Sequence, residues 1–381
     1  MVDKSGEKKK ILLIRHRDFS FTDLSIYQQL LMWFPDYEIV VFNVYDLYKK
    51  ITVFQLFINL FYFIWEYGVD FLTGVKKFRN IFTFFKSTSY FVNIFRKHTV
   101  KAIYEGNYYF VFQLQSLFNG VARGVPHFVY SDHITLANYH YPNINPRQYA
   151  RSSRFVKIER ALYQQSLRCF TMSSNISELI VKEYKVQESK VKCVYAGNNV
   201  KIDFNAKKHT YAQKTILFVG VDWKRKGGPV LLKAFEKVLM EVPDARLITI
   251  GCKPDTYDVK NVSVKGKLKL EELPEYFSNA TVFCMPTMRE PFGLVFVEAM
   301  VYRLPIVANN IGALPDMVKN GVNGYLIDND VSEYAKALIK LLKDQDLCKQ
   351  LGENGYNIAM ENYIWDKVGQ KLHMYINEAM E

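Results

Sequence analysis

Two glutamates, Glu290 and Glu298, form an E-x7-E arrangement, and their carboxylates are candidates for catalysis or for ligand binding. Glu290 precedes Pro291, and a residue before proline is biased toward extended backbone, so we expect it in a loop. Gly293 then opens an apolar helical stretch, whose first free N–H groups suit a diphosphate. Carboxylates beside an anion would be repelled unless they accept hydrogen bonds from sugar hydroxyls, and a nucleotide sugar supplies both groups. The alternative is a surface glutamate and a capping glutamate on an ordinary crossover helix.

The elements that must position these residues are predicted as short buried strands alternating with helices. Strands are expected at 10–15, 37–43, 108–114, 127–130, 169–173, 215–219, 246–250, 282–285 and 305–308. Helices are expected at 24–33, 229–240, 271–277 and 294–302. Such alternation is typical of α/β folds with parallel sheets, and the polar run 201–209 interrupts the series before it restarts. The sequence therefore predicts two doubly wound, Rossmann-like domains facing a central cleft, with domains at 1–205 and 206–360 and a C-terminal helix at 361–381.

Composition narrows the choice of partners. The 381 residues carry a net charge of +12, and residues 1–205 alone hold 27 basic and 16 acidic side chains, a surplus of +11. An anionic partner is therefore expected on the first half. The five cysteines form no CxxC pair, which predicts buried free thiols. No apolar segment precedes the first expected strand, so we expect a cytoplasmic protein without a signal peptide.

The sequence lacks the motifs that are typical of several enzyme classes. No glycine-rich dinucleotide motif follows the first expected strand, and there is no GxxxxGK[ST], HExxH or GxSxG motif. Nicotinamide oxidoreductases and P-loop NTPases are disfavoured on that ground. The triples 328–330 and 344–346 have the form Asp-X-Asp, but we interpret them as a loop and a helix surface, so no metal is expected.

The run 286–300 resembles the signature of the retaining family 4 glycosyltransferases, which have the GT-B fold. The stretch 218–228 resembles that family's phosphate loop, and 169–173, 159–163, 194–200, 321–324 and Trp365 also match its pattern. The resemblance covers most of residues 105–370. It implies a metal-independent hexosyltransferase that needs no cofactor and uses a UDP- or GDP-sugar as co-substrate. It also implies that the C-terminal helix packs back toward the N-terminal domain.

The resemblance assigns roles to individual residues. Those proposed as catalytic are Glu290, Lys226, Arg225, His133 and Asp132. Those proposed for donor binding are Glu298, Phe292, Gly293 and Leu294, with Gly266 and Lys267 beside the base. Lys226 and Arg225 would neutralise the diphosphate as charge builds on the leaving group. His133 and Asp132 follow an expected strand, and the alternative is a strand-end pair that only caps a turn.

The chain departs from the family pattern at several positions. Val221 stands where members commonly carry an arginine after the glycine of the phosphate loop, so Arg225 or Lys224 must supply the second positive charge. Arg303 replaces a usual glycine, Asp316 a usual glutamate, and a glycine-rich loop after the first strand is absent. These departures leave open how the donor diphosphate is enclosed from the N-terminal side.

Residues 51–98 are unusually aromatic, with fifteen aromatic side chains within 54–95. The longest uncharged run, 51–65, is shorter than the roughly 20 residues that span a bilayer. Aromatics interleaved with cations suit an anionic membrane surface, and the cations concerned are Lys76, Lys77, Arg79, Lys86, Arg96 and Lys97. For 51–72 membrane contact and core packing both stay open, whereas contact is favoured for 75–97. Nucleic acid is not expected as a partner.

These observations predict a glycosyltransferase that moves a sugar from a nucleotide-sugar donor to a hydroxyl of a glycan or lipid-linked acceptor. Polysaccharide or lipopolysaccharide biosynthesis, on the inner face of a membrane, would suit such an acceptor. Two alternatives remain open. One is a nucleotide-sugar epimerase of similar build, which needs no acceptor, and the other is a non-catalytic protein that binds sugar nucleotides.

Overall fold

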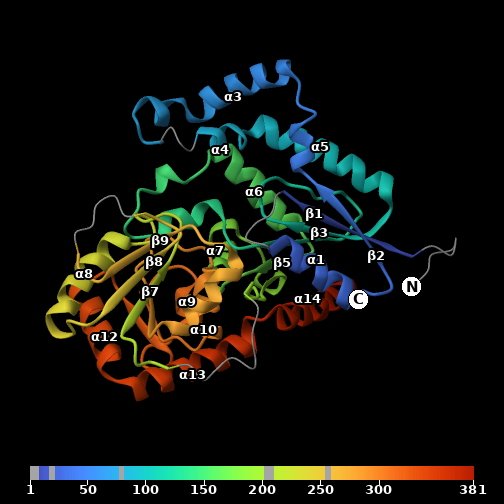
Figure 1. The fold of residues 1–381 in the computed structure, drawn as a ribbon. Helices are drawn as coiled ribbons and strands as arrows, with labels where there is room; N and C mark the ends of the chain where they lie inside the picture. Colours follow the sequence, from blue (N-terminus) through green and yellow to red (C-terminus); the bar gives the residue numbers. More distant parts are fainter. Residues whose placement is uncertain (1–7, 17–21, 77–80, 201–209, 254–258) are drawn as a thin grey trace. The chain divides into compact units, whose positions relative to one another are not determined.

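The computed structural model describes residues 8–16, 22–76, 81–200, 210–253 and 259–381. The chain divides into two compact units, Met1–Tyr195 with Val368–Glu381, and Ala196–Lys367 (Figure 1). Each unit contains a six-stranded sheet whose pairings are all parallel, with helices connecting the strands. The predicted α/β class is thereby confirmed.

The sheet of the first unit has the strand order β2-β1-β3-β4-β5-β6. Its strands are β1 (Lys10–Arg15), β2 (Glu38–Asn43), β3 (Tyr108–Leu114), β4 (His127–Ser131), β5 (Arg168–Thr171) and β6 (Val191–Cys193). Its helices are α1 (Thr22–Trp33), α2 (Tyr45–Tyr48), α3 (Val53–Leu72), α4 (Ile81–Phe85), α5 (Ser89–Gly106), α6 (Ser153–Gln165) and α7 (Ser174–Tyr184). Short 3₁₀ turns lie at η2 (Thr135–His140), η3 (Pro146–Gln148) and η4 (Glu188–Lys190).

The sheet of the second unit has the order β12-β11-β10-β7-β8-β9. Its strands are β7 (Thr215–Val219), β8 (Arg246–Ile250), β9 (Val262–Gly266), β10 (Val282–Met285), β11 (Ile306–Asn309) and β12 (Gly324–Ile327). Its helices are α8 (Gly228–Glu241), α9 (Leu273–Asn279) after the turn η5 (Leu270–Glu272), α10 (Leu294–Val301), α11 (Leu314–Met317), α12 (Val331–Lys343) and α13 (Gln345–Asn362).

The strands form where the sequence has uninterrupted apolar runs, because a parallel sheet covered on both faces buries every side chain. Ile216, Leu217 and Phe218 of β7 are fully buried, and so are Val282 and Phe283 of β10. One predicted helix is corrected: the segment expected at 271–277 is a 3₁₀ turn followed by an α-helix that starts at Leu273. Pro274 fits the first turn of α9, where no backbone N–H is needed.

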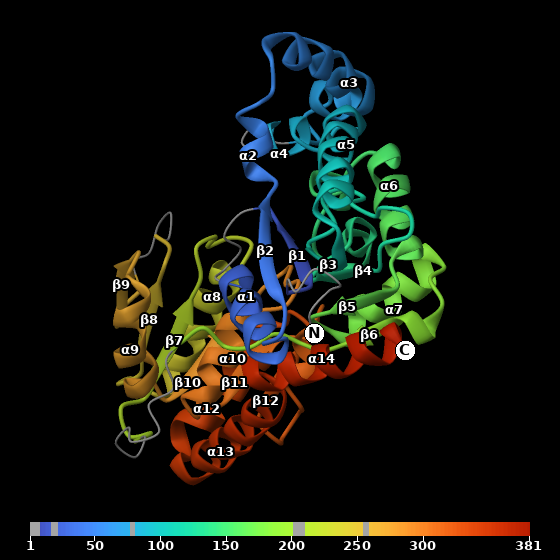
Figure 2. The same cartoon turned by 90° about the vertical axis from the view of Figure 1, so that its right-hand side faces the viewer.

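The last helix, α14 (Trp365–Met380), contributes its residues from Val368 onward to the first unit. His373 stacks edge-on against Phe34 with ring centroids 5.1 Å apart, and the guanidinium of Arg168 lies 2.6 Å from the carboxylate of Glu378. Figure 2 shows this helix running beside β5 and β6. The domain boundaries at 205 and 360 stay a prediction, and the expected linker 201–209 lies outside the described residues.

The aromatic segment 51–98 forms α3, α4 and most of α5. Residues of α5, among them Phe91, Val92 and Phe95, pack in one core with β1 and β3, whereas α3 lies beyond α4 and α5 from that sheet (Figure 1). Thr52 caps the start of α3 and Thr88 caps the start of α5, each accepting a hydrogen bond from a backbone N–H. Within the described residues, no helix is long and apolar enough to cross a membrane.

Candidate active site

The predicted phosphate loop follows β7 and is pressed against the end of β10. Gly227 has a φ of +79°, and a Cβ atom there would lie 1.8 Å from the carbonyl oxygen of Pro286. A Cβ on Gly228 would lie 2.1 Å from the ring of Trp223. Only glycine fits both positions, so these two residues set how closely the loop approaches the segment carrying Glu290.

Three interactions join this loop to the segment after β10. The backbone N–H of Met288 donates to the carbonyl oxygen of Arg225 at 2.9 Å. The Arg225 guanidinium donates in turn to the carbonyl oxygen of Arg289, also at 2.9 Å. Beside them, the Lys226 ammonium forms an ion pair with the Glu290 carboxylate. Two segments some sixty residues apart in sequence therefore present their charged side chains as one rigid group.

The Lys226–Glu290 pair is largely removed from water. Glu290 is only 5% exposed. Burial lowers the pKa of Lys226, while the Glu290 carboxylate opposes that change and the nearby Arg225 and Arg289 add to it. Desolvating two charges costs free energy that their mutual attraction only partly returns, so a buried ion pair is weak evidence for a purely stabilising role. A pair of this kind is suited to exchanging partners when an anion and hydroxyls arrive.

Glu298 lies on the second turn of α10 and is 7% exposed. Burial raises the pKa of its carboxyl group to about 7. Among the residues that the structure describes, none donates a hydrogen bond to this carboxylate. Buried carboxylates are normally paired or hydrogen-bonded, so an incoming ligand with hydroxyl groups would satisfy an outstanding requirement of this site.

Gly293 caps the start of α10 with a φ of +99°. A Cβ atom here would lie 2.8 Å from the Phe296 ring and 3.1 Å from Cγ of Glu290, so glycine holds Glu290 and the helix start close together. The Phe292 side chain is buried and faces Tyr363, with ring centroids 6.2 Å apart. The predicted contact of Phe292, Gly293 and Leu294 with the sugar-nucleotide donor is therefore made by their backbone.

Gly266 and Lys267 stand apart from these residues. Gly266 ends the edge strand β9, three strands away from β10 in the sheet order, and its carbonyl accepts from the N–H of Gly251 at 2.6 Å. Lys267 is exposed. Their place beside the nucleotide base stays a prediction.

His133 and Asp132 follow β4 in the first unit. The buried Asp132 carboxylate accepts a hydrogen bond from Nε2 of Gln115 at 3.2 Å, and the ring of His133 stacks on Tyr141 with centroids 6.3 Å apart. Glu159 fixes the following backbone, since its carboxylate accepts from the Thr135 N–H at 3.0 Å and from the Ser116 hydroxyl at 2.6 Å. Gln115 could not be predicted from the sequence, because it belongs to no motif and its hydrogen bond to Asp132 depends on the tertiary structure.

The cations assigned to a membrane or acceptor side are dispersed. Lys77 and Arg79 lie outside the described residues. Lys76 corrects the prediction of an exposed cation: it is 4% exposed, its ammonium donates to the Ala150 carbonyl oxygen at 2.5 Å, and burial lowers its pKa to about 8. Lys86 and Lys97 are exposed, and Arg96 donates to the carbonyl oxygen of Val121 at 3.5 Å.

The two acidic triples have structural positions in the second unit. Asp330 caps α12 by accepting from the N–H groups of Ser332 and Glu333 at 2.7 and 3.0 Å. Asp344 caps α13 by accepting from the N–H of Leu347 at 2.9 Å. Over the described residues, no group of three or more His, Cys, Asp or Glu side chains is arranged to hold a metal ion.

The two-sheet architecture has close counterparts among solved structures, and these define the class as GT-B. Sucrose-phosphate synthase from Thermosynechococcus elongatus superposes with a TM-score of 0.68 at 16% identity, covering 97% of this chain and 98% of that one. Anabaena HepE, in complex with UDP and glucose, superposes with a TM-score of 0.65 at 13% identity, covering 97% and 99%. At such identities the likeness shows the fold alone.

Residues 199–358 match the family model described as glycosyl transferases group 1. Bacillus subtilis spore coat protein SA is 28% identical over 236 residues, which cover 53% of this chain and 62% of that protein. D-inositol 3-phosphate glycosyltransferase from Corynebacterium jeikeium is 32% identical over 186 residues, 44% of each chain. The chain thus spans between about two-fifths and three-fifths of the length of these curated relatives.

Proposed function

We propose that this protein is a retaining glycosyltransferase that moves a sugar from a nucleotide-sugar donor to an acceptor hydroxyl without a metal. The observation that carries the proposal is the buried Glu298 carboxylate, which accepts no hydrogen bond from the described residues and lies on α10, the helix that begins just after Glu290 of the Lys226–Glu290 pair. Two buried carboxylates and a buried cation are an unfavourable group in isolation. A diphosphate flanked by the hydroxyls of two sugars satisfies all three.

In this proposal the donor rearranges the ion pair. Lys226 turns its ammonium to the diphosphate, and Arg225 reinforces it, while Glu290 accepts hydroxyls of the transferred sugar and Glu298 those of the ribose. The bond between the anomeric carbon and the phosphate oxygen breaks, and a bond from the same carbon to the acceptor oxygen forms on the same face. The acceptor proton passes to the leaving phosphate. Lys226 stabilises the negative charge that develops there, which is usually a large catalytic contribution.

The acceptor side is assigned to the first unit, with His133 contacting the transferred sugar and Asp132 orienting it or the acceptor. Their position after a strand of a parallel sheet supports this role, because ligands bind beyond the carboxyl ends of such strands. The Glu159 network supports it further by fixing the backbone that follows His133.

A screen of nucleotide sugars tests the donor proposal. We expect one UDP- or GDP-sugar to raise the melting temperature of the wild type and to be hydrolysed slowly without acceptor. Glu298→Gln should lose both effects, whereas Glu236→Gln, an exposed glutamate on α8, should keep them. If no nucleotide sugar stabilises the protein and Glu298→Gln behaves like wild type, the proposal is wrong. Turnover to an isomeric nucleotide sugar would instead identify an epimerase.

We further propose that the protein works on a glycan or lipid-linked acceptor at the cytoplasmic face of a membrane, as in polysaccharide or lipopolysaccharide biosynthesis. Helix α3 supports this because it carries large apolar side chains on its outer face as well as on its inner face. The inner face packs through Phe63 and Tyr67 and is also held by polar contacts: the Asn59 amide donates to the Phe85 carbonyl oxygen at 2.8 Å, and Glu66 accepts from the Ser89 and Ser152 hydroxyls at 2.6 and 2.5 Å.

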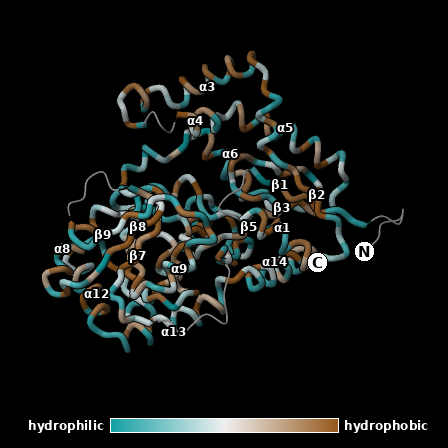
Figure 3. Tube along the Cα trace, in the orientation of Figure 1, coloured by the Kyte–Doolittle hydropathy of each residue, from teal (hydrophilic) through white to brown (hydrophobic). Residues whose placement is uncertain are grey.

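The outer face of α3 is apolar, with large side chains between 42% and 89% exposed. Figure 3 colours much of this helix as hydrophobic. They are Val53, Phe54, Leu56, Phe57, Leu60, Phe61, Ile64, Trp65, Val69 and Leu72. Exposed apolar patches of this kind mark interaction sites, and a helix with one apolar face can lie in a membrane interface. The guanidinium of Arg154, 3.3 Å from the centroid of the Trp65 ring, supplies a cation at its edge. The proposed contact therefore rests on 53–72 rather than on 75–97.

Sedimentation with liposomes tests this contact. Wild-type protein should co-sediment with vesicles containing anionic lipid, and the double variant Phe57→Ser/Phe61→Ser should remain in the supernatant. Leu24→Ser/Met32→Ser on α1, which also removes two exposed apolar side chains, serves as the matched control and should still co-sediment. Equal sedimentation of wild type and the α3 variant would overturn the assignment.

A further inference from the structure

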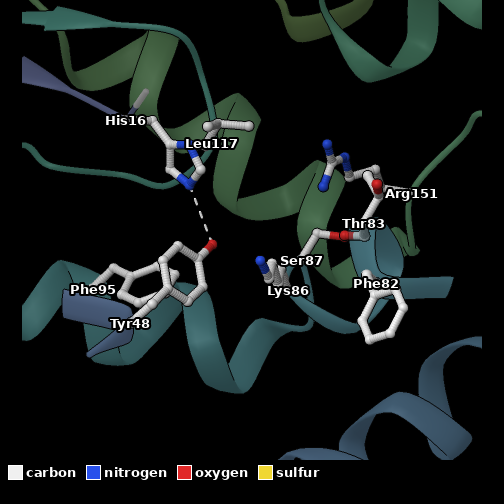
Figure 4. A pocket seen from close by; sticks show the side chains of 9 residues that line it. All are labelled: His16, Tyr48, Phe82, Thr83, Lys86, Ser87, Phe95, Leu117 and Arg151. Carbon is white, nitrogen blue, oxygen red and sulfur yellow. Dashed lines mark hydrogen bonds between the residues drawn. The ribbon is translucent and has the colours of Figure 1, made fainter. Parts of the chain in front are cut away.

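A cavity of about 320 Å³ opens in the first unit where β1, the end of α4 and the segment before α6 meet. Its lining includes His16, Lys86 and Arg151 but no aspartate or glutamate. Aromatic side chains, Tyr48 and Phe95 among them, form the wall. In Figure 4 the Lys86 ammonium and the Arg151 guanidinium both point into the space, and the His16–Tyr48 pair closes the other side. The cavity therefore combines positive charge with apolar surface.

The two cations in this cavity are held by aromatic rings rather than by carboxylates. The Lys86 ammonium lies 4.8 Å from the centroid of the Tyr48 ring, and the Arg151 guanidinium carbon lies 4.8 Å from that of Phe155. Within the described part of the chain, neither forms an ion pair with an acidic side chain. Nearby acids are committed elsewhere, since Glu66 accepts from serine hydroxyls and Asp70 lies 3.9 Å from the Lys76 ammonium. The cavity keeps its positive charge available.

A hydrogen bond and nearby cations surround this cavity. His16 Nε2 and the Tyr48 hydroxyl are 3.2 Å apart and hydrogen-bonded, which fixes the wall between the cavity and its neighbour. Arg151 acts to lower the pKa of the buried Lys76, which lies nearby but does not line the cavity. Cations from separate segments thus converge on one place, as expected for recognition of a compact anion.

A second cavity of about 260 Å³ adjoins the first, because His16 and Leu117 line both. Its other side includes Gln115, whose amide donates to the Asp132 carboxylate. The two cavities therefore lie next to each other in the first unit, with His16 between the Gln115 side, which leads to Asp132, and the cations Lys86 and Arg151. A ligand that occupied both would have one end toward Asp132 and an anionic end in the basic cavity.

We propose that the basic cavity binds a phosphoryl group of the acceptor, while the acceptor's reacting hydroxyl lies in the second cavity toward Asp132. This inference rests on the proposed glycosyltransferase function and names the acceptor class: a phosphorylated or diphosphorylated glycan or lipid. Charge-assisted hydrogen bonds from Lys86 and Arg151 hold the phosphoryl oxygens. The aromatic wall covers the apolar part of the molecule beside them.

Binding of inorganic pyrophosphate tests the cavity without any sugar chemistry. Pyrophosphate would be titrated calorimetrically into wild type, Lys86→Gln/Arg151→Gln and Lys226→Gln. The comparison separates binding at the proposed donor loop from binding in the basic cavity. The double variant should lose the site, with affinity down by about tenfold or more, and Lys226→Gln should retain it. Lys86→Arg/Arg151→Lys keeps both charges and should bind, which separates lost recognition from lost folding. Lys101→Gln, an exposed cation of the same unit, is the control for net charge.

The source of the phosphate is decided by two further probes. If the acceptor is lipid-linked, vesicles containing phosphatidic acid should bind wild type more tightly than phosphatidylcholine vesicles, with the excess lost in Lys86→Gln/Arg151→Gln. If it is soluble, glucose 1-phosphate should compete with pyrophosphate and the vesicle excess should not depend on these cations. Equal pyrophosphate affinity for wild type and the double variant would overturn the proposal.

Failure of this inference can be told from failure of the proposed function. Hydrolysis of a nucleotide sugar depends on Lys226 and Glu298, and the cavity variants should leave it unchanged while raising KM for a phosphorylated acceptor. A wild type that hydrolyses no nucleotide sugar but binds pyrophosphate through Lys86 and Arg151 would refute the enzyme and keep the anion site. A wild type that hydrolyses the donor but does not bind pyrophosphate through Lys86 and Arg151 would refute the anion site and keep the proposed enzyme.

Discussion

The proposed donor site and the proposed acceptor surface are built in opposite ways. In the second unit, Arg225, Lys226, Met288 and Glu290 are joined across two loops, and glycines allow those loops to touch. In the first unit, α3 turns its apolar side chains to solvent, and the basic cavity leaves its cations without carboxylate partners among the described residues. The cations that would face the diphosphate are thus paired within the protein before a ligand binds, although the Glu298 carboxylate is not. The cations of the basic cavity have no carboxylate partner among the described residues, and the apolar side chains of α3 face solvent.

Breaking the ion pair should give the largest effect. Lys226→Met removes the cation that faces the leaving group, so we expect sugar transfer to fall by about 10²–10³-fold. It also leaves Glu290 buried and unpaired, which should lower the free energy of unfolding by about 3–5 kcal/mol. Urea unfolding and donor hydrolysis measure the two effects. Lys233→Met, on the exposed side of α8, should change neither.

A second substitution separates the two effects of that variant. Lys226→Met/Glu290→Gln removes both charges, so most of the stability should return while transfer stays low. Recovery of transfer in the double variant would contradict the assigned role of Lys226, because no cation would then be needed at the leaving group.

The two faces of α3 should respond oppositely to the same substitution. Phe63 is 7% exposed and packs against Phe71 and Phe85, so Phe63→Ala should lower the free energy of unfolding by about 3 kcal/mol or slightly more. Phe61 is 59% exposed, and Phe61→Ala should change stability by less than about 0.5 kcal/mol. Thermal and urea unfolding of the two variants measure the contrast. Comparable losses would mean that the outer face is covered by the protein itself.

The titration of Glu298 should make the ligand-free protein less stable as pH rises. Its carboxyl has a pKa of about 7 when folded and 4.5 ordinarily, so the unfolded chain releases this proton first. The contribution is fully present below pH 4.5 and is lost as pH rises to about 7, at most about 3 kcal/mol in all. Urea unfolding at pH 5 and pH 8 should show this fall in wild type and not in Glu298→Gln. Parallel pH profiles for the two proteins would contradict it.

Restoring the family's arginine should have the smallest effect. Val221 is 72% exposed beside the phosphate loop, so Val221→Arg would add a solvated charge at little structural cost. An exposed charge interaction is worth up to about 1 kcal/mol, which corresponds to roughly fivefold tighter donor binding at low salt. The gain should shrink as salt is added, and Val221→Gln should not show it. An unchanged affinity would mean that Arg225 already supplies the second charge.

Features that depend on residues close together in the sequence could be predicted from the sequence. A motif places Glu290, Gly293 and Glu298 within nine consecutive positions, and proline and glycine there fix the loop and the helix start through their own backbone preferences. Features that depend on contacts between distant segments could not be predicted in this way. Lys76 was expected at a surface, but its ammonium is held by carbonyl groups more than seventy residues away in sequence.

The class of fold follows from the amino-acid sequence alone, because apolar runs that need burial on both sides can only become strands of covered parallel sheets. The resemblance to a glycosyltransferase family is likewise visible in the sequence, because short motifs with fixed spacing carry it. Which face of α3 is apolar and exposed depends on packing, since Asn59 and Glu66 find their partners on α4, α5 and the segment before α6. The tertiary structure alone brought His16, Lys86 and Arg151 to one cavity. Side chains from three distant segments converge through packing, and no spacing along the chain records that.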